Sequence, residues 1–310
     1  MKTTLAFALV FVLVGSTCLG QASSEPTSIV PLPKIRIDDA EVHVHSQGLF
    51  VTDEHYFVTG RLETKPKRAL LFRFSRKDPN KYEFVDLTPP SKGKAVLDHP
   101  GGFDRDAKGV YWIPISTSNR KGPTTVRGLT IDPKKPLGDA LSIQHSIELD
   151  DHVGAVCCVE NDLLAASWDT KTIYRLSTSK DAKDADKGKI VREALDRSKF
   201  IAGDPKWFLA VQDWKYDAQS KFVVAGGIDK SPARPREESN SVLGLIDLRS
   251  KTASTLRFDA IEGVARPLTN EGMALYQGEL FLLPEDLGRG AKILRFKIPE
   301  MMSKTLGRRE

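Results

Sequence analysis

Short runs of β-branched, aromatic and aliphatic residues recur along the whole chain, and glycine, proline, aspartate, asparagine or lysine separates each run from the next. The 3.6-residue periodicity of an amphipathic helix is missing almost everywhere. This alternation of short apolar runs and turn residues is typical of an all-β protein. One unit repeats within it: a polar residue beside a glycine or an aromatic residue, a short strand, a charged turn and a second apolar strand.

Five copies of this unit follow one another at intervals of about 50 to 60 residues. A third apolar strand follows in every copy and a fourth in the first four copies. Units of four strands at this spacing indicate the blades of a β-propeller. The polar residues that open the five copies are Gln47, His99, His152, Gln212 and Glu271.

The fifth copy lacks a fourth strand, and the segment from Ile35 to Val44 supplies a strand that belongs to no copy. We therefore predict a five-bladed β-propeller closed by an N-terminal strand, because closure hides the exposed edges of the sheets. A six-bladed ring is the alternative, and a parallel β-helix or a sandwich also stays open. The polar segments 177–189 and 230–240 are expected to be loops within blades.

Residues 1–22 are predicted to be a signal peptide. Lys2 precedes an apolar run that is too short to cross a bilayer, and small residues precede Ala22, after which we expect cleavage. A lipid anchor on Cys18 is the alternative, although the usual aliphatic residue before it is missing. Residues 23–310 then form a single domain, a secreted or periplasmic monomer with no contact with a membrane.

The composition is that of an ordinary globular protein, with 46 Lys and Arg against 41 Asp and Glu in 310 residues, a net charge of +5. No basic stripe interleaved with aromatic residues occurs, so nucleic acid is not an expected partner. Three cysteines exclude a disulfide scaffold. Cys157 and Cys158 are neighbours and are expected to be reduced, with a strained disulfide between them as the alternative.

The first strand of each propeller blade lines the axis, so the five opening residues are expected to meet there. Two imidazoles, a carboxylate and two amide oxygens could hold a divalent metal, calcium or zinc. The predicted metal ligands are Gln47, His99, His152, Gln212 and Glu271. The alternative is a structural cluster that ties loops together and holds water.

A metal at the axis would activate water or polarise the bond to be cleaved, and a neighbouring base could take the proton. The predicted catalytic residues are Asp151, His152 and Glu271, with the Asp151 carboxylate orienting the imidazole of His152. The sequence contains no Gly-x-Ser-x-Gly elbow, phosphate-binding glycine loop or His-Glu-x-x-His motif. Serine hydrolases, nucleotide kinases and zincins are therefore disfavoured.

The tryptophans are expected mainly in the core between blades, although two of them flank the fourth opening and could stack on a sugar. The predicted ligand-binding residues are Trp207, Asp213, Trp214 and Asn270. His43 and His45 alternate on the predicted closing strand and so share a face, where we expect them at the surface. Glu285 and Asp286 follow a strand and are expected in a solvated turn.

The segment from Asn270 to Ala274, together with Gly278 to Asp286, resembles secreted bacterial propellers, among them phytase-like esterases and calcium-dependent apyrases. The segment from Asp204 to Val211 also looks like an apyrase segment, but Lys206 replaces the acid of that family. The whole chain most resembles an uncharacterised family of secreted propeller-like proteins over about residues 30–300. The resemblance implies the fold and export but no particular activity.

The sequence therefore leaves two functions open. The first is a metal-assisted hydrolase of an ester, lactone, phosphoester or glycoside. The second is a non-catalytic module that binds a glycan, a small molecule or a protein. The acid and imidazole content of the predicted axial cluster favours the first.

Overall fold

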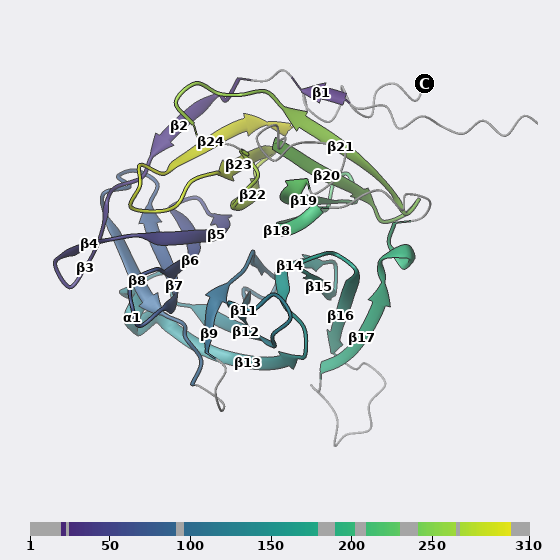
Figure 1. Ribbon diagram of the computed structural model, residues 1–310, viewed down its shortest axis with the longest axis horizontal. Helices are drawn as coiled ribbons and strands as arrows, with labels where there is room; N and C mark the ends of the chain where they lie inside the picture. The colour runs from purple at the N-terminus through teal and green to yellow at the C-terminus, as the bar shows by residue number, and fades with distance from the viewer. Residues whose placement is uncertain are drawn as a thin grey trace, which may run out of the picture.

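The computed structural model describes residues 20–22, 25–90, 96–178, 190–201, 209–229, 241–264 and 267–298. These residues form five mostly antiparallel sheets arranged in a ring around an axis (Figure 1). The prediction of a five-bladed β-propeller is confirmed. The six-bladed ring, the β-helix and the sandwich are excluded.

Blades 1 to 3 each begin at the axis and take their strands in chain order outward. In blade 2 the innermost position is shared by two short strands, β9 and β10. The strands of these blades are β5 (Val44–Val51), β6 (His55–Leu62), β7 (Arg68–Ser75) and β8 (Tyr82–Asp86); β9 (Leu97–Pro100), β10 (Asp104–Arg105), β11 (Tyr111–Thr117), β12 (Thr124–Ile131) and β13 (Leu141–Leu149); and β14 (Val153–Val159), β15 (Asp162–Ser167), β16 (Thr172–Thr178) and β17 (Ile190–Asp196).

Blades 4 and 5 each contain a strand from the N-terminal segment at their outer edge. Their strands are β18 (Leu209–Asp217), β19 (Phe222–Asp229), β20 (Ser241–Asp247), β21 (Thr252–Phe258) and β1 (Gly20–Ala22); and β22 (Gly272–Tyr276), β23 (Glu279–Leu283), β24 (Lys292–Lys297) and β2 (Ser28–Pro31). The named helical elements of the described residues are α1 (Leu137–Ala140) and a 3-10 turn (Arg197–Lys199), and no described helix is long and apolar enough to span a bilayer.

The N-terminal strand that completes blade 5 differs from the predicted one. β2 pairs antiparallel with β24, whereas Ile35–Ile37 (β3) forms a separate hairpin with Ala40–Val42 (β4). The hairpin forms because Asp38 and Asp39 both adopt positive φ, 50° and 63°, which a two-residue hairpin turn requires. The prediction that an N-terminal strand closes the ring is confirmed, but this strand is β2 and not the predicted segment that begins at Ile35. β1 lies within the predicted signal peptide, so cleavage after Ala22 would leave blade 4 with its own four strands.

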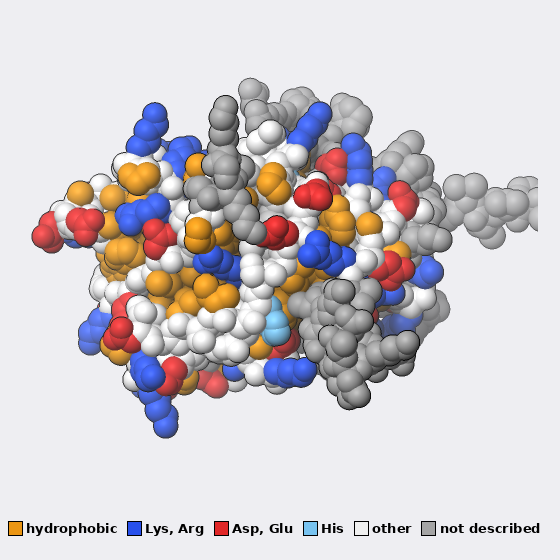
Figure 2. Space-filling model, turned by 90° about the horizontal axis from the view of Figure 1, so that it is seen from below, with side chains coloured by type: hydrophobic (Ala, Val, Ile, Leu, Met, Phe, Trp, Pro, Cys, Tyr) orange, Lys and Arg blue, Asp and Glu red, His pale blue; other side chains and the backbone are white. Residues whose placement is uncertain are grey.

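In the described part of the chain, the hydrophobic core consists of five clusters, one between each pair of neighbouring blades. Phe72 and Phe281 belong to the cluster between blades 1 and 5, and Trp214 to the cluster between blades 3 and 4. The other three clusters fill the interfaces of blades 4 and 5, 2 and 3, and 1 and 2. Burial of these side chains holds the blades face to face and fixes where each inner strand meets the axis. On the side of the molecule seen in Figure 2, acidic and basic side chains are interspersed.

Four of the described inner strands, β5, β9, β14 and β18, carry a β-bulge or a similar register shift. The residues left unpaired by the shifts are Gln47, Asp98, Gly154 and Gln212. A bulge inserts one extra residue and redirects the side chains around it. The polar opening residues of blades 1 and 4 therefore depart from the alternation of the strand and lie buried near the axis, 2% and 8% exposed.

Backbone contacts close the middle of the axis. Gly102 N donates to the carbonyl oxygens of Gly154 (3.0 Å) and Gln212 (3.1 Å), so that blades 2, 3 and 4 meet there. A Cβ on Gly102 would lie 2.5 Å from Gln212 O, a distance that only glycine tolerates. Next to Gly102, the carboxylate of Asp213 accepts the backbone N–H groups of Leu49 and Met273, both at 3.0 Å, and pairs with Lys215.

Candidate functional site at the axial face

The candidate site lies on the face where the inner strands begin. In a propeller, the loops between the second and third strands of each blade reach this same face. The inner-strand starts supply His45, His99, His152 and Glu271, and the second-to-third-strand loop of blade 5 supplies Asp286. Four of the six histidines in the sequence, His43, His45, His99 and His152, gather here from blades 1 to 3.

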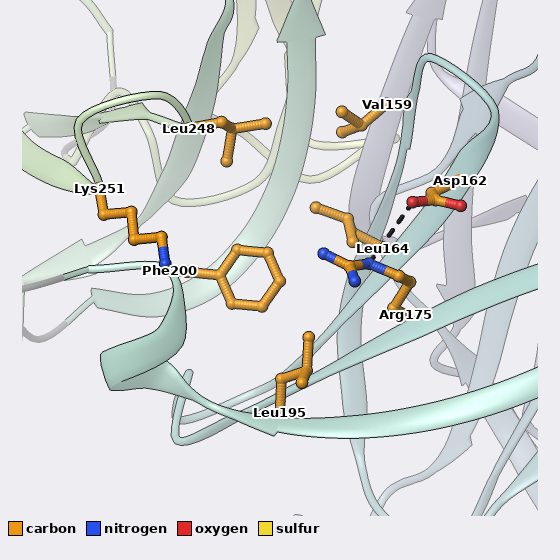
Figure 3. Close-up of a pocket in the computed structure, with 8 residues that line it drawn as sticks. All are labelled: Val159, Asp162, Leu164, Arg175, Leu195, Phe200, Leu248 and Lys251. Carbon is orange, nitrogen blue, oxygen red and sulfur yellow. Dashed lines mark ion pairs between the residues drawn. The ribbon is translucent and has the colours of Figure 1, made fainter.

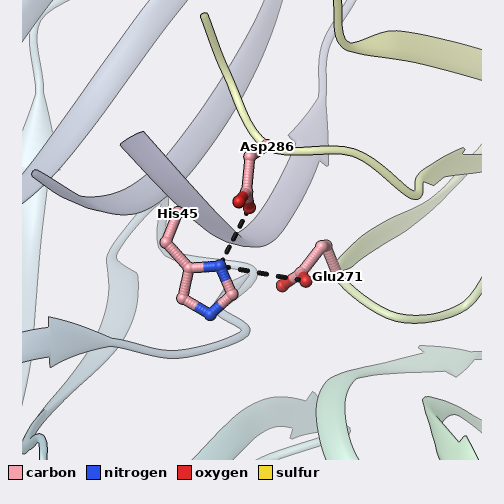
Figure 4. A group of neighbouring side chains, drawn as sticks. All are labelled: His45, Glu271 and Asp286. Carbon is pink, nitrogen blue, oxygen red and sulfur yellow. Dashed lines mark hydrogen bonds and ion pairs between the residues drawn. The ribbon is translucent and has the colours of Figure 1, made fainter. Parts of the chain in front are cut away.

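The centre of the site is a triad of His45, Glu271 and Asp286, which have ligand-type atoms within 4.8 Å of one another (Figure 4). Nδ1 of His45 lies 2.8 Å from Asp286 Oδ1 and 3.9 Å from Glu271 Oε1. Figure 4 shows the same ring nitrogen facing both carboxylates. One imidazole and two carboxylates in this arrangement could hold a divalent metal ion.

Glu271 is 2% exposed and is held by two side-chain amides. Gln47 Nε2 donates to Oε2 at 3.3 Å, and Asn270 Nδ2 donates to Oε1. Burial and the neighbouring charge of Asp286 raise the pKa of Glu271 well above its ordinary value. A cation beside Glu271 would oppose both effects, because it stabilises the ionised form.

Asp286 is bound on both of its oxygens. Oδ1 accepts from the backbone N–H of Ser46 at 3.1 Å and contacts His45, and Oδ2 lies 2.7 Å from His43 Nε2. Burial by itself raises the pKa of Asp286, but the hydrogen bonds and charges of His45 and His43 outweigh it and lower the pKa below its usual value. Asp286 is therefore the ionised carboxylate of the triad, and His43 orients it.

His99 is fixed in a single neutral form by Arg61. Nη1 of Arg61 lies 2.8 Å from His99 Nδ1, and a guanidinium only donates, so Nδ1 is the acceptor and Nε2 carries the proton. Burial lowers the pKa of His99 well below its ordinary value, and the charges of Arg61 and His152 lower it further. His99 thus lacks a free lone pair and presents an N–H donor, which corrects its expected role as a metal ligand.

His152 has the opposite tautomer. Its Nδ1 lies 3.1 Å from the carbonyl oxygen of Asn119, which only accepts, so Nδ1 carries the proton and Nε2 holds the lone pair. Burial lowers the pKa of His152, which keeps the ring neutral. Its ring centroid lies 5.6 Å from that of His99. A hydrogen-bond donor and a base therefore lie side by side.

The neutral state of His99 predicts a pH dependence of stability. The pKa of His99 in the folded protein lies below the unfolded value of 6.5. The contribution of neutral His99 to the free energy of unfolding is therefore fully present above pH 6.5, and it is lost as the pH falls from there toward the folded pKa. We expect His99→Gln to lose less stability than the wild type between pH 7.5 and 5.5, by up to about 1.4 kcal/mol. Urea unfolding at the two pH values measures the difference, and equal losses in both proteins would contradict it.

Asp151 does not orient the imidazole of His152 as the sequence predicts. Its Oδ1 accepts from the backbone N–H of His152 at 2.8 Å, and its Oδ2 accepts from the hydroxyl of Tyr174 at 3.1 Å. The carbonyl of Asn119 orients the ring instead. Gln212 is buried near the axis, where its backbone carbonyl binds Gly102.

Two of the predicted ligand-binding residues lie in the interior. Trp214 is 1% exposed within the core between blades 3 and 4, so no face of its ring can stack on a sugar. Asp213 is fully buried, and its hydrogen bonds with Lys215, Leu49 and Met273 hold three blades together. Both assignments are corrected to structural roles. Trp207 lies outside the described residues, and Asn270 contacts Glu271 in the site.

Both cysteines of β14 are free thiols. Cys157 is buried and Cys158 half-buried, and burial raises the pKa of each. A thiol held protonated is a poor nucleophile. Neither cysteine is therefore a candidate for catalysis.

Sequence reasoning missed four residues of the site: His43, His45, Arg61 and Asp286. The two histidines do share a face, but they are about one-quarter exposed and bind the carboxylate of Asp286 instead of lying at the surface. The signal that could have found them was the period-two spacing of His43 and His45 beside the opening residue of blade 1. Asp286 does not lie in the solvated turn that the sequence predicts. Its side chain is 22% exposed and binds His43, His45 and the backbone N–H of Ser46.

Comparisons with known proteins support the fold. No protein-family model matches the sequence, and no curated protein matches it either. The glutaminyl cyclase of Myxococcus xanthus has a similar structure with a TM-score of 0.53 at 12% identity, over 90% of this chain and 97% of that one. A candidate glycoside hydrolase from Parabacteroides distasonis has a TM-score of 0.50 at 13% identity, also over 90% and 97%. At these identities the similarity shows the fold alone.

Proposed function

We propose that the axial face is the active site of a metal-assisted hydrolase. The observation that carries the proposal is the meeting of His45, Glu271 and Asp286 from two blades, with ligand atoms within 4.8 Å. A neutral histidine pair of opposite tautomers lies beside this triad. Such a combination of ligand set, donor and base is what hydrolysis at a metal centre needs.

The donor set favours zinc over calcium. Calcium takes six to eight oxygen ligands, whereas catalytic zinc sites have three protein ligands of the His, Asp and Glu type and keep one position open. Zinc held by His45, Glu271 and Asp286 would supply Lewis-acid chemistry and lower the pKa of a water molecule. His43 would keep Asp286 oriented, as an outer hydrogen-bond partner does in metal sites.

The neighbouring histidines then have distinct roles. We assign His152 as the general base, because its Nε2 lone pair can take a proton. We assign His99 as a hydrogen-bond donor to negative charge that develops on the substrate, because Arg61 keeps its proton on Nε2. Arg61 is itself held by Glu63, with Nη2 2.6 Å from Oε1, so this donor is rigid.

The proposed substrate class is an ester, lactone, phosphoester or glycoside. A metal-bound water and a neighbouring base could act on any of these bonds, and the structural similarity to a candidate glycoside hydrolase makes a glycoside worth testing. We further propose that the protein is exported after cleavage behind Ala22 and acts as a secreted or periplasmic monomer on a small molecule or a glycan.

The test is a turnover assay of the zinc-loaded protein with chromogenic esters, lactones, phosphoesters and glycosides. We expect turnover of one class, and a kcat roughly 100-fold lower or more in His152→Gln. His145→Gln is the matched control, because His145 stacks on Trp112 at 5.2 Å, away from the site, and should keep the wild-type kcat. Absence of turnover with every class, or full activity of His152→Gln, would contradict the proposal. Saturable binding without turnover would point to the non-catalytic module instead.

A further inference from the structure

A cavity lies between blades 3 and 4, away from the axial site. Its volume is about 290 Å³, near the lower end of the range of small-molecule sites. It shares no residue with the axial site. The side chains that line it are Val159, Asp162, Leu164, Arg175, Leu195, Phe200, Leu248 and Lys251 (Figure 3).

The walls of this cavity are apolar and its polar groups are mainly cationic. Two of its eight residues are cations and one is an acid, so the charge of the lining is +1. In Figure 3, Lys251 of blade 4 and Arg175 of blade 3 extend from opposite sides toward the ring of Phe200. An apolar space with cations on two sides suits a molecule that has a hydrocarbon body and an anionic head.

The two cations keep hydrogen-bonding capacity for a ligand. Nε of Arg175 lies 3.4 Å from Asp162 and Nη1 lies 3.4 Å from Glu193, both longer than a strong charge-assisted hydrogen bond. Nε itself is buried, whereas the Arg175 side chain as a whole is 42% exposed, so the end of the guanidinium is the part that a ligand can reach. Lys251 is exposed and makes no ion pair within the described part of the chain.

We propose that this cavity, named here the rim cavity, binds a small monocarboxylate with an apolar chain. The hydrocarbon part lies against Leu164, Leu195 and Phe200, and the carboxylate accepts hydrogen bonds from Lys251 and Arg175. The separation from the axis makes this site independent of the proposed hydrolytic site. A ligand of about ten non-hydrogen atoms in such a site binds with a dissociation constant on the order of 1 mM.

The experiment is a ligand-observed NMR titration of the full protein with sodium octanoate. Octylammonium, which has the same chain and the opposite charge, is the control ligand. We expect saturable binding of octanoate and roughly tenfold weaker binding of octylammonium, because Lys251 and Arg175 repel its head. Equal binding of the two ligands would overturn the assignment of the anionic head.

Protein variants locate the site. Lys251→Glu reverses the charge at the rim, and Leu248→Trp fills the cavity from a half-buried position, so each should weaken octanoate binding roughly tenfold with an unchanged melting temperature. Lys77→Glu is the matched control, because Lys77 is exposed in the corresponding third-to-fourth-strand turn of blade 1. Wild-type affinity of both Lys251→Glu and Leu248→Trp would overturn the proposal, as would loss of binding in His45→Ala, which would place octanoate at the axial site.

Discussion

Replacement of Asp213 by alanine is expected to lower the free energy of unfolding by about 3–5 kcal/mol at pH 7. Asp213 is fully buried and pairs with Lys215, which is 3% exposed and also donates to the carbonyl of Phe103 at 2.7 Å. The variant leaves the buried ammonium without this partner, and it removes the acceptor of two backbone N–H groups, those of Leu49 and Met273. Urea unfolding followed by circular dichroism measures the loss.

Two further variants distinguish the effect of the unpaired buried charge from the effect of lost packing. Asp213→Ala/Lys215→Met should be more stable than Asp213→Ala, because it leaves no unpaired buried charge. Glu41→Ala removes one partner of the exposed pair Lys34–Glu41 and should cost less than about 1 kcal/mol. A loss in Asp213→Ala as small as that in Glu41→Ala would contradict the structural role of the buried pair.

The stability of Lys215→Met at different pH values tests the electrostatic interaction between Asp213 and Lys215. Burial raises the pKa of Asp213 to about 6, although Lys215 and the two backbone N–H groups act to lower it. Loss of Lys215 removes a lowering influence, so the folded pKa rises further above the unfolded value. Proton uptake by Asp213 stabilises the folded protein at low pH, and this stabilisation is lost as the pH rises through the folded pKa of Asp213. Lys215→Met should therefore be less destabilised at pH 5 than at pH 8.

Replacement of Asp286 by alanine is expected to weaken zinc binding roughly 100-fold or more. The substitution removes one of three ligands and also releases His45 and His43, which the Asp286 carboxylate holds at 2.8 and 2.7 Å. Competition with a zinc-sensitive dye at pH 7.5 measures the dissociation constant. The protein should release protons as it binds zinc, because the metal replaces them on its ligands.

His43→Ala tests the contribution of a residue that orients a ligand of the same site. His43 holds Asp286 without being a member of the triad, so we expect a smaller loss of zinc affinity, roughly 10-fold. His145→Ala, on blade 2 and away from the axial face, should bind zinc as the wild type does. Equal affinity of the wild type and Asp286→Ala would show that zinc binds elsewhere.

The blades could be predicted from the sequence because each is a local unit. Four strands joined by short turns leave a repeating pattern of apolar runs, and the intervals between Gln47, His99, His152, Gln212 and Glu271 mark the ring. The closing strand was placed wrongly because Ile35 and Ile37 are as apolar as a strand in a sheet. They pack into the core from a hairpin whose turn depends on the backbone conformation of Asp38 and Asp39.

The site could be predicted only in part, because its contacts cross between blades. Glu271 and His152 open their blades and reach the axial face as the repeat implies. Asp286 comes from a second-to-third-strand loop, and only the closure of the ring brings it to His43 and His45. The tautomers of His99 and His152 depend on Arg61 and on the carbonyl of Asn119, partners that no local sequence pattern indicates.

X-ray absorption at the zinc K-edge of the loaded wild-type protein is the most direct test of the metal centre. We expect one zinc per chain, bound by nitrogen and oxygen at about 2.0–2.2 Å, with an imidazole contribution that is lost in His45→Ala. Sulfur at about 2.3 Å would place the metal at the cysteines of β14, and a shell of water oxygen alone would show that the triad holds no metal. Either result would contradict a metal centre built from His45, Glu271 and Asp286.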